Sequence, residues 1–444
     1  VHGLEGEIVE ANTFYQDEHD LYGKCDFVMA NPPFNVDKVD AEKVKDDRRL
    51  RFGLPGVNKE KKVSNGNYLW ISYFHSYLGP KGRAGFVMSS QASSAGHGEA
   101  EVRRKIVETG DVDVMISIRS NFFYTRTVPC ELWHLDRGKP KERRDQVLML
   151  DARNVYRKVT RKIYDFSPEQ LANLTAIVWL YRGQSDRFID LVQSYLDRTL
   201  SEAALIAGRA TALQTAYQAF VDATAPFLKT LAKDSPLREL VKERDGAAKA
   251  CLASLDEWTG RIGKDWKKPV EPKASAQRKR LEQLDPLAQA CRELVKEVDL
   301  VCKLAGRVVD AAEKDANARE HEEWDTRAIG RLEKDVDAQR KELVEQLKRT
   351  AYFERQAHWL LSRFPDATFV PVAGLCRAVT IKEIEAADWS LTPGRYVGVA
   401  PAEFDEDFDF EQAIKDIHTE LADLNEEAVA LAAKIQENLE GLGT

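Results

Sequence analysis

The sequence predicts an α/β fold in its first 150 residues, followed by long α-helices and a C-terminal coiled-coil helix. In the first 150 residues, short apolar runs bounded by Gly, Pro or charged residues alternate with helical stretches, which is typical of a doubly wound sheet. From about 185 to 362 the chain is rich in Ala, Leu, Glu, Lys and Arg, and apolar residues recur every three or four positions. This spacing predicts long helices, arranged as antiparallel hairpins.

Five apolar runs predict strands, and two stretches between them predict helices. The strands are Asp26–Ala30, Ala84–Ser89, Val112–Ile118, Val128–Leu135 and Val147–Leu150, and the helices are Asn67–Leu78 and Ala100–Thr109. In the remaining sequence, Ser-Pro-Glu at 167–169 predicts the start of a helix. A Pro-containing stretch at 266–272 predicts a break between helices. We therefore divide the chain into 1–166, a helical region 167–364, and a connector with a C-terminal helix at 365–444.

Composition restricts the functional classes. The net charge of the 444 residues is −8, so binding to nucleic acid needs local basic patches or a partner that supplies phosphate contacts. The six cysteines form no C-x-x-C pair, which favours reduced thiols in the cytoplasm over disulfides or a zinc site. The sequence has no signal peptide and no run of eighteen apolar residues. We expect a cytoplasmic protein without a membrane or metal.

The strongest motif is the loop Asn31-Pro32-Pro33-Phe34, which directly follows the predicted strand Asp26–Ala30. Ligands of open α/β sheets bind at the carboxyl ends of strands. The exocyclic amine of adenine is a poor nucleophile, because its lone pair is delocalised into the ring. The Asn31 side-chain oxygen and the Pro32 carbonyl can accept its two hydrogens, and the two prolines keep this backbone rigid. Phe34 offers a flat face to a flipped base; the alternative is a Pro-rich turn with Phe34 simply packed.

The tetrapeptide resembles motif IV of the amino-methyltransferases that use S-adenosylmethionine. Further segments resemble, in order, the modification subunits of type I restriction-modification systems. They are LRFGLP (50–55), GNYLWISYFHSYLGPKGRAGFVMSS (66–90), the stretch 98–139, DWSLTPGRYVG (388–398) and ENLEGLG (437–443). The resemblance covers residues 1–182 and about 365–444. The central helical region has the look of an enlarged insert.

The resemblance implies a partial Rossmann-like methyltransferase sheet, with Asn31, Pro32, Pro33 and Phe34 as catalytic residues. Phe123 matches the motif VIII aromatic that faces the target adenine from the other side; the alternative is a core aromatic beside its neighbours. Asn12 stands where the family often places an Asp that contacts the adenine of the cofactor. Its alternative is an ordinary turn residue.

By the same resemblance, the function is site-specific methyl transfer from S-adenosylmethionine to adenine N6 in double-stranded DNA. A separate specificity subunit would read the target, and a restriction subunit and a second copy of the modification subunit would join the assembly. One alternative is an Asn-Pro-Pro-aromatic methyltransferase acting on protein glutamine or rRNA, although those enzymes usually lack a long helical tail. Another is a non-catalytic helical scaffold.

The sequence departs from the family at its start. The family's glycine-rich cofactor loop lies upstream of motif IV, whereas only Gly3, Gly6 and Gly23 precede Asn31, and they form no G-x-G. The chain also begins at Val1 rather than at Met. We expect an N-terminal truncation, or a remainder on another polypeptide. We also expect this chain alone to bind the cofactor poorly and to be inactive.

Two further features concern partners. Four basic clusters either contact DNA phosphates or form solvated surface: Arg103, Arg104 and Lys105; Arg119 and Arg126; Arg137, Lys139, Lys141, Arg143 and Arg144; Arg157, Lys158, Arg161 and Lys162.

In the last predicted helix, apolar residues alternate in steps of four and three: Phe410, Ile414, Ile417, Leu421, Leu424, Ala428, Leu431 and Ile435. This pattern predicts a coiled-coil stripe, covered either by the chain's central helices or by a helix of the specificity subunit.

Overall fold

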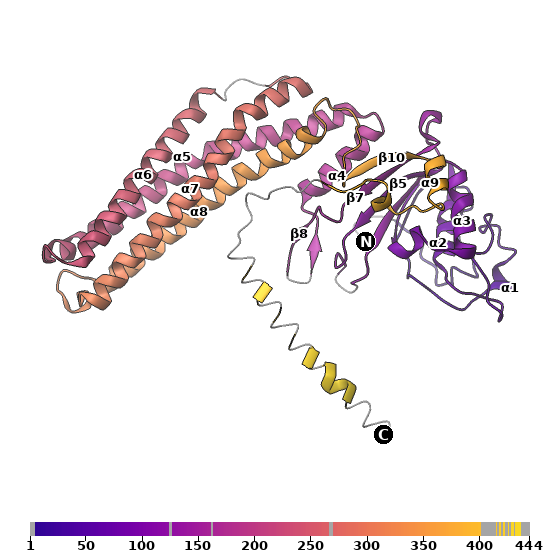
Figure 1. The fold of residues 1–444 in the computed structure, drawn as a ribbon, viewed down its shortest axis with the longest axis horizontal. Helices are drawn as coiled ribbons and strands as arrows, with labels where there is room; N and C mark the ends of the chain where they lie inside the picture. Colours follow the sequence, from indigo (N-terminus) through magenta and orange to yellow (C-terminus); the bar gives the residue numbers. More distant parts are fainter. Residues whose placement is uncertain are drawn as a thin grey trace. The chain divides into compact units, whose positions relative to one another are not determined.

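The computed structural model describes residues 5–123, 127–160, 163–265 and 270–400, together with separate helical positions between 414 and 436. The chain forms two compact units, coloured along the sequence in Figure 1. One unit combines residues 1–167 with 371–444, and the other is 168–370. The helical unit is therefore inserted into the chain of the first unit.

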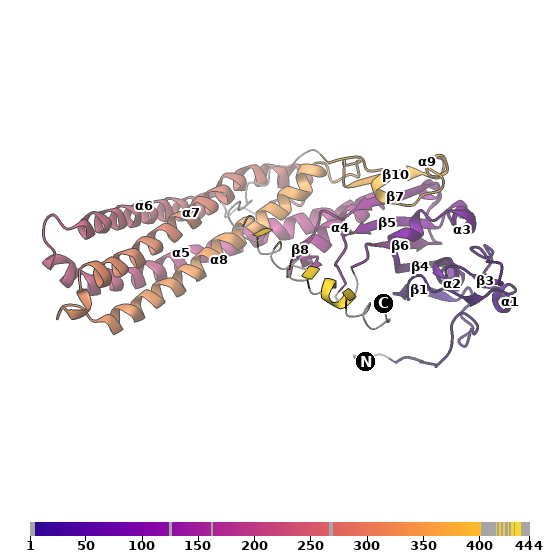
Figure 2. The same cartoon turned by 60° about the horizontal axis from the view of Figure 1, so that its bottom comes forward.

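The first unit is built on a mixed six-stranded sheet (Figure 2). Its strands, in spatial order, are β1 (Cys25–Ala30), β4 (Leu78–Ser89), β6 (Cys130–Asp136), β5 (Val112–Ile118), β7 (Gln146–Asp151) and β10 (Cys376–Thr380). β1 is parallel to β4, and β5 is parallel to β7, whereas β6 is antiparallel to both its neighbours and β10 is antiparallel to β7. The five predicted strands all lie in this sheet, so the prediction of an α/β fold is confirmed.

One face of the sheet is covered by α2 (Asn67–Tyr77), α3 (His97–Glu108) and α9 (Ile381–Ala386), whose apolar side chains share a core with the strands. Strand residues alternate between the two faces. Val28 and Ala30 of β1 accordingly pack into this core, whereas Phe27 and Met29 are 75% and 89% exposed. A doubly wound sheet has helices on both faces. At β1, helices cover the face of Val28 and Ala30, but within the described ranges no helix covers the face of Phe27 and Met29.

A smaller apolar cluster packs beside α2. It joins Phe14, Leu69 and Tyr73 to a short hairpin of β2 (Val39–Asp40) and β3 (Lys62–Val63) and to α1 (Ala41–Val44). The Asp40 side chain caps α1 by accepting from the Glu42 amide. This cluster fixes the segments on both sides of the Asn-Pro-Pro-Phe loop.

After the helical unit, the chain returns to the sheet as β10 and then packs beside the short helix η1 (Ser90–Ser93). The Leu391 amide donates to the Ser93 carbonyl at 2.8 Å. Arg103 of α3 is 2% exposed and donates to the carbonyls of Trp389 and Ala95, both at 2.7 Å. The DWSLTPGRYVG segment is therefore held on the sheet by a buried guanidinium.

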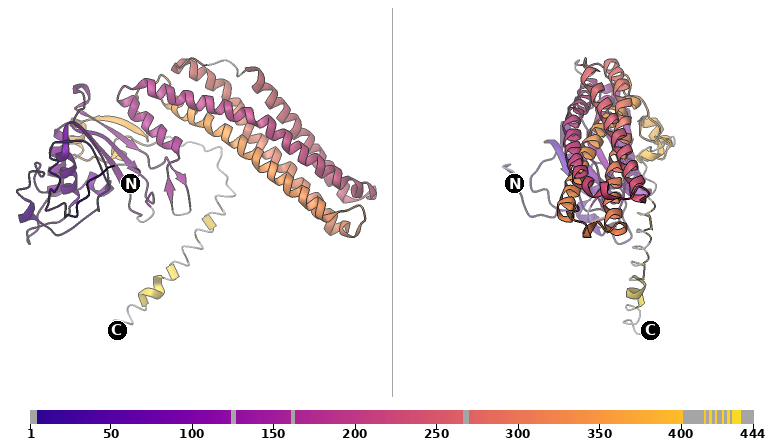
Figure 3. Two further views of the ribbon diagram at one scale, coloured as in Figure 1. Left: turned by 180° about the vertical axis from the view of Figure 1, so that it is seen from behind. Right: turned by 90° about the vertical axis from the view of Figure 1, so that its left-hand side faces the viewer.

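The second unit consists of α4 (Pro168–Tyr181), α5 (Ser185–Thr230), α6 (Pro236–Asp265), α7 (Ala274–Asp315) and α8 (Thr326–Arg363). α5 packs along α8, α8 along α7, and α7 along α6, as Figure 3 shows. α6 ends at Asp265 and α7 begins at Ala274. Residues 266–269 of the predicted break lie outside the described residues. In the described part of the chain, no helix is both long and apolar enough to cross a membrane.

Two residues of the predicted C-terminal stripe, Phe410 and Leu424, lie outside the described residues. Ile414, Ile417, Leu421, Leu431 and Ile435 are described, and all five are helical and more than 45% exposed. The predicted helix is thus present at these positions. Its role in assembly stays a prediction.

We expect Arg103→Met to loosen the connector from the sheet. The change leaves two half-buried carbonyls without this donor, at the lower end of the range of roughly 1–3 kcal/mol each, so the first unit should lose about 2–4 kcal/mol of stability. Hydrogen exchange should show reduced protection of the Leu391 amide and of β10, with α5 and α8 unchanged. The exposed neighbour variant Arg104→Met is the control, and equal protection in both variants would contradict the assignment.

Candidate functional site

The Asn-Pro-Pro-Phe loop leaves β1 at the carboxyl edge of the sheet. Asn31 and Pro33 are exposed, Pro32 is buried and Phe34 is half-buried. The backbone of this loop is thus anchored by Pro32, while the Asn31 side chain is open to solvent. Because β4 and β5 run parallel to β1, the segments that follow these strands lie at the same edge of the sheet.

The loop is closed by two asparagines that bond each other. Asn35 has φ 54°, in the left-handed region that Asn tolerates better than most residues. Its amide donates to the Asn67 side-chain oxygen at 2.9 Å, and the Asn67 amide group donates back to the Asn35 side-chain oxygen at 2.9 Å. Asn67 is 1% exposed at the start of α2. Sequence reasoning missed Asn67, because an asparagine at a helix start is ordinarily only a cap.

A cleft of about 700 Å³ opens beside this loop. It is lined by Glu10, Ala11, Asn12, Thr13, Phe14, Gln16, Pro33, Val36 and Trp70. The structure therefore brings together two of the predicted site residues, Asn12 and Pro33. A larger groove, of about 1390 Å³, lies in the helical unit, but none of the predicted site residues lines it.

Trp70 was not predicted as a site residue, although it forms one wall of the cleft. Its ring lies 4.4 Å from that of Phe14, centroid to centroid, and stacks on Phe74 at 6.1 Å. The indole N–H is buried, and no acceptor for it exists among the described residues. The cleft thus has an aromatic wall, which suits a flat heterocycle.

Asn12 has the turn role that was its alternative interpretation. Its side-chain oxygen accepts from the Phe14 amide at 3.1 Å, and its carbonyl accepts from the Tyr15 and Gln16 amides. Asn12 is exposed, and its side-chain nitrogen makes no hydrogen bond within the described ranges. That nitrogen remains available to a ligand, so the turn role and a cofactor contact are compatible.

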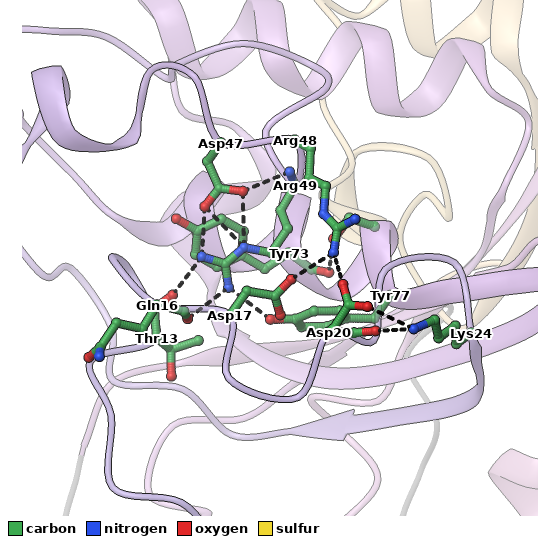
Figure 4. A network of polar contacts seen from close by, with 11 residues as sticks. Thr13, Gln16, Asp17, Asp20, Lys24, Asp47, Arg48, Arg49, Tyr73 and Tyr77 are labelled. Carbon is green, nitrogen blue, oxygen red and sulfur yellow. Dashed lines mark hydrogen bonds and ion pairs between the residues drawn. The ribbon is translucent and has the colours of Figure 1, made fainter.

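Arg49 holds the Asn12–Gln16 wall in place (Figure 4). The residue is 1% exposed, forks onto the Asp47 carboxylate at 2.6 and 3.0 Å, and lies 4.1 Å from the Tyr73 ring. It donates to the carbonyls of Thr13 at 3.0 Å and Gln16 at 3.3 Å. A buried charge with this many partners makes the wall rigid.

Phe123 lies in the connection from β5 to β6 and is half-buried. Its neighbour Phe122 packs on Phe166 with ring centroids 4.6 Å apart, whereas no ring contact is found for Phe123 in the described part of the chain. Phe123 is therefore the more available of the two aromatics at this edge. Tyr124 lies outside the described residues.

Glu131 is a buried acid at the same edge that sequence reasoning also missed. It is 1% exposed on β6, one of its carboxyl oxygens accepts from the Ser117 hydroxyl at 3.2 Å, and the other has no partner among the described residues. Burial raises the pKa of Glu131 to about 8, against the opposing effects of Ser93, Ser117 and Arg153. The carboxyl group is thus largely protonated at neutral pH.

Single members of two of the four basic clusters are buried, although other members of the same clusters, such as Lys141 and Arg144, are exposed. Arg103 is buried, and Arg104 is paired with Glu101 and Glu108. Lys139 is 3% exposed and donates to the Val112 carbonyl at 2.6 Å, and its neighbour Arg143 pairs with the buried Asp113. Both interpretations, DNA contact and solvated surface, are therefore wrong for Arg103 and Lys139.

None of the six cysteines, all of which are described, forms a disulfide. Among the described residues, no three or more His, Cys, Asp and Glu lie together as a possible metal site.

The structure thus places the Asn-Pro-Pro-Phe loop at the carboxyl end of a strand of a mixed sheet, as the sequence resemblance to amino-methyltransferases leads us to expect. The family model described as "N-6 DNA Methylase" matches residues 1–194. Residues 1–194 are thus similar to the N-6 DNA methylase family, and the relatives they resemble include methylase subunits of type I restriction enzymes.

Two similar relatives are methylase subunits of type I restriction enzymes. The chain is 37% identical over 190 residues to the methylase subunit of the type I restriction enzyme MjaIX of Methanocaldococcus jannaschii, covering 42% of this chain and 33% of the relative. It is 28% identical over 193 residues to the HindI methylase subunit of Haemophilus influenzae, covering 43% of this chain and 41% of the relative. The chain thus spans less than half the length of these relatives.

Solved structures show a similar but weaker likeness. The type I methyltransferase subunit of Streptococcus thermophilus is 19% identical, with a TM-score of 0.34, over 38% of this chain and 34% of that one. At this score the likeness adds no argument to the sequence match.

We expect Glu131→Gln to change the pH dependence of stability. A pKa near 8 in the folded state lies above the value of about 4.3 in an unfolded chain. The folded state therefore binds more protons between these pH values, and wild-type stability falls as pH rises from about 4.5 to 8.

The Gln variant lacks this loss, so it should be more stable than wild type at pH 8 by a few kcal/mol, at about 1.4 kcal/mol per pKa unit. The difference should vanish near pH 4.5. Urea unfolding at several pH values measures it, with the exposed Glu142→Gln as control. A difference that is independent of pH would show that Glu131 titrates normally.

Proposed function

We propose that the chain supplies the target-base half of a site-specific, adenine-N6 DNA methyltransferase subunit of a type I restriction-modification system. The observation that supports this most is the Asn31-Pro32 pair at the carboxyl end of β1, beside a cleft that contains Asn12, Pro33 and Trp70. The sheet would be the C-terminal part of a Rossmann-like S-adenosylmethionine-dependent methyltransferase domain.

The chain's own residues would activate the amine. The exposed Asn31 side-chain oxygen and the Pro32 carbonyl accept the two N–H groups of adenine N6, so that the nitrogen lone pair leaves the ring. Pro32 is buried and the loop is closed by the Asn35–Asn67 pair, so both acceptors are preorganised. Phe34 and Phe123 would hold the flipped base between two aromatic faces.

The cleft beside the loop would hold the adenosine of S-adenosylmethionine, which supplies an electrophilic methyl group when bound. Trp70 forms part of the cleft's aromatic wall, and the Asn12 side-chain nitrogen makes no hydrogen bond among the described residues. These groups fit an adenine ring. The inactivity of these 444 residues by themselves stays a prediction, based on the lack of a G-x-G loop ahead of Asn31.

The partners we propose are double-stranded DNA, a specificity subunit, a restriction subunit and a second modification subunit, in the cytoplasm. The named relatives are methylase subunits of type I restriction enzymes. The apolar stripe of the last helix, exposed at its described positions, would pack on a helix of the specificity subunit.

Two alternatives remain distinguishable by experiment. An enzyme acting on protein glutamine or rRNA would methylate those substrates and leave duplex DNA unlabelled. A helical scaffold would bind no cofactor. The packing of the connector on the sheet and the long helical unit favour the DNA enzyme, because compact methyltransferases usually lack such a tail.

We expect Asn31→Ala to lower single-turnover methylation by about 10²–10³, since one positioned hydrogen bond in a transition state is lost. DNA affinity should change little, because phosphate contacts dominate it. The assay uses the native methyltransferase assembly, a labelled methyl donor and duplex DNA. Asn58→Ala, in an exposed loop, is the control. Full turnover by Asn31→Ala would exclude the proposed chemistry.

We expect Trp70→Ala to weaken S-adenosylmethionine binding by about 5- to 100-fold, the range for loss of one stacked base. Trp70→Phe should retain most of the affinity, because the ring face remains. Calorimetry on the native assembly measures this, with Trp359→Ala in α8 as control and a thermal melt to verify folding. Unchanged affinity in folded Trp70→Ala would remove the cleft from cofactor binding.

A further inference from the structure

Arg119 follows the last residue of β5 and lies in an aromatic corner. Its guanidinium carbon is 4.3 Å from the centroid of the Tyr156 ring and 4.4 Å from that of the Tyr164 ring. The two rings stand at 84° to each other with centroids 5.0 Å apart. Contact with both rings restricts the rotation of a side chain that is otherwise flexible.

The guanidinium nevertheless has no hydrogen-bond acceptor or ion-pair partner among the described residues. Carboxylates nearby in the chain are already engaged: Asp165 accepts from Arg157 at 2.7 and 2.9 Å, and Asp151 accepts from Arg153. Arg49, Arg103 and Arg143, in contrast, are all bonded within the protein. Arg119 is thus a half-buried, fixed cation whose N–H groups are open to an external anion.

The corner is joined to the loop that carries Phe123. Tyr156 precedes β8 (Arg157–Lys158), and Tyr164 is the first residue of β9 (Tyr164–Asp165), which pairs with β8 as an antiparallel hairpin. The Tyr164 amide donates to the Asn121 carbonyl at 3.0 Å, and Phe122 packs on Phe166. The hairpin and the β5–β6 connection therefore form one structure at the carboxyl edge, with Arg119 at its base.

We propose that Arg119, held by Tyr156 and Tyr164, is a phosphate-binding site for the DNA strand that carries the target base. A guanidinium presents paired N–H groups that match two phosphate oxygens, and a fixed one loses little entropy on binding. Arg103 and Lys139 are buried, and Arg104 and Arg143 are paired with carboxylates, whereas Arg119 lies at the edge that carries the proposed target-base residues. The proposal rests on the proposed function.

The test compares Arg119→Gln, Arg119→Lys and the control Arg104→Gln in the native assembly. Binding to a duplex is measured by fluorescence anisotropy at several salt concentrations. Each phosphate contact contributes about 0.9 to the slope of log K against log salt. Arg119→Gln should lower the slope by about 0.9 and raise the KM for DNA about tenfold, with kcat unchanged.

Arg119→Lys keeps the charge without the paired N–H groups, so it should recover the slope but only part of the KM. Tyr164→Leu should resemble it, because the cation remains but is no longer fixed. If folded Arg119→Gln showed an unchanged slope of log K against log salt, the phosphate assignment would be wrong. Methylation of DNA by the wild-type assembly would in that case still support the proposed function. An Arg119-dependent slope without any methyl transfer would instead retain the phosphate site and reject the proposed function.

A lower kcat at unchanged KM and slope would also overturn the proposal, since Arg119 would then act on the reacting base. Equal effects of Arg119→Gln and Arg104→Gln would show that only overall charge matters. Absence of DNA binding by the wild-type assembly would overturn both proposals together.

Discussion

The first unit depends on the buried guanidinium of Arg103, which joins parts of the chain 286 residues apart. The sheet is completed by β10, which follows the whole helical unit in the sequence. The connector after β10 then packs on the same sheet. A buried arginine is tolerated only when its donors are satisfied. Here they are satisfied by carbonyls of the connector and of the segment before α3, so the charge is stable only when both are in place.

The candidate site follows the same principle at smaller scale. The Asn-Pro-Pro-Phe loop has little freedom, since Pro32 is buried and Asn35 is bonded reciprocally to Asn67. The opposite wall is fixed by Arg49 through backbone carbonyls. In each case a buried polar side chain holds the backbone of the site in one conformation. The exposed side chains of Asn12 and Asn31 are among the groups that we propose bind the ligands. Such a site loses little conformational entropy when it binds.

The sequence predicted the strands well, because buried strands are short apolar runs with clear ends, as in Val112–Ile118. It also singled out Asn31 and Asn12, which have motif or family signals. It could not single out Trp70 or Glu131, whose significance lies in an unpaired atom and burial rather than in a pattern. Arg103 was misjudged as surface because it is followed by Arg104 and Lys105, yet Val102 and Ile106 already mark its helix face as apolar.

Charge is distributed unevenly between the two edges of the sheet. In the loop after β6, at the amino edge, Lys139 and Arg143 are buried or half-buried and bonded within the protein, so they stabilise the fold and offer nothing to a ligand. At the carboxyl edge, one oxygen of Glu131 and the guanidinium of Arg119 lack partners in the described chain. Buried or half-buried polar groups without partners lower the stability of a fold, and in proteins they occur mostly at functional sites. Glu131, protonated near neutral pH, adds no negative charge beside a phosphate-binding edge. A raised pKa for this acid and an open cation at Arg119 therefore act in the same direction, towards an edge that accepts an anionic strand.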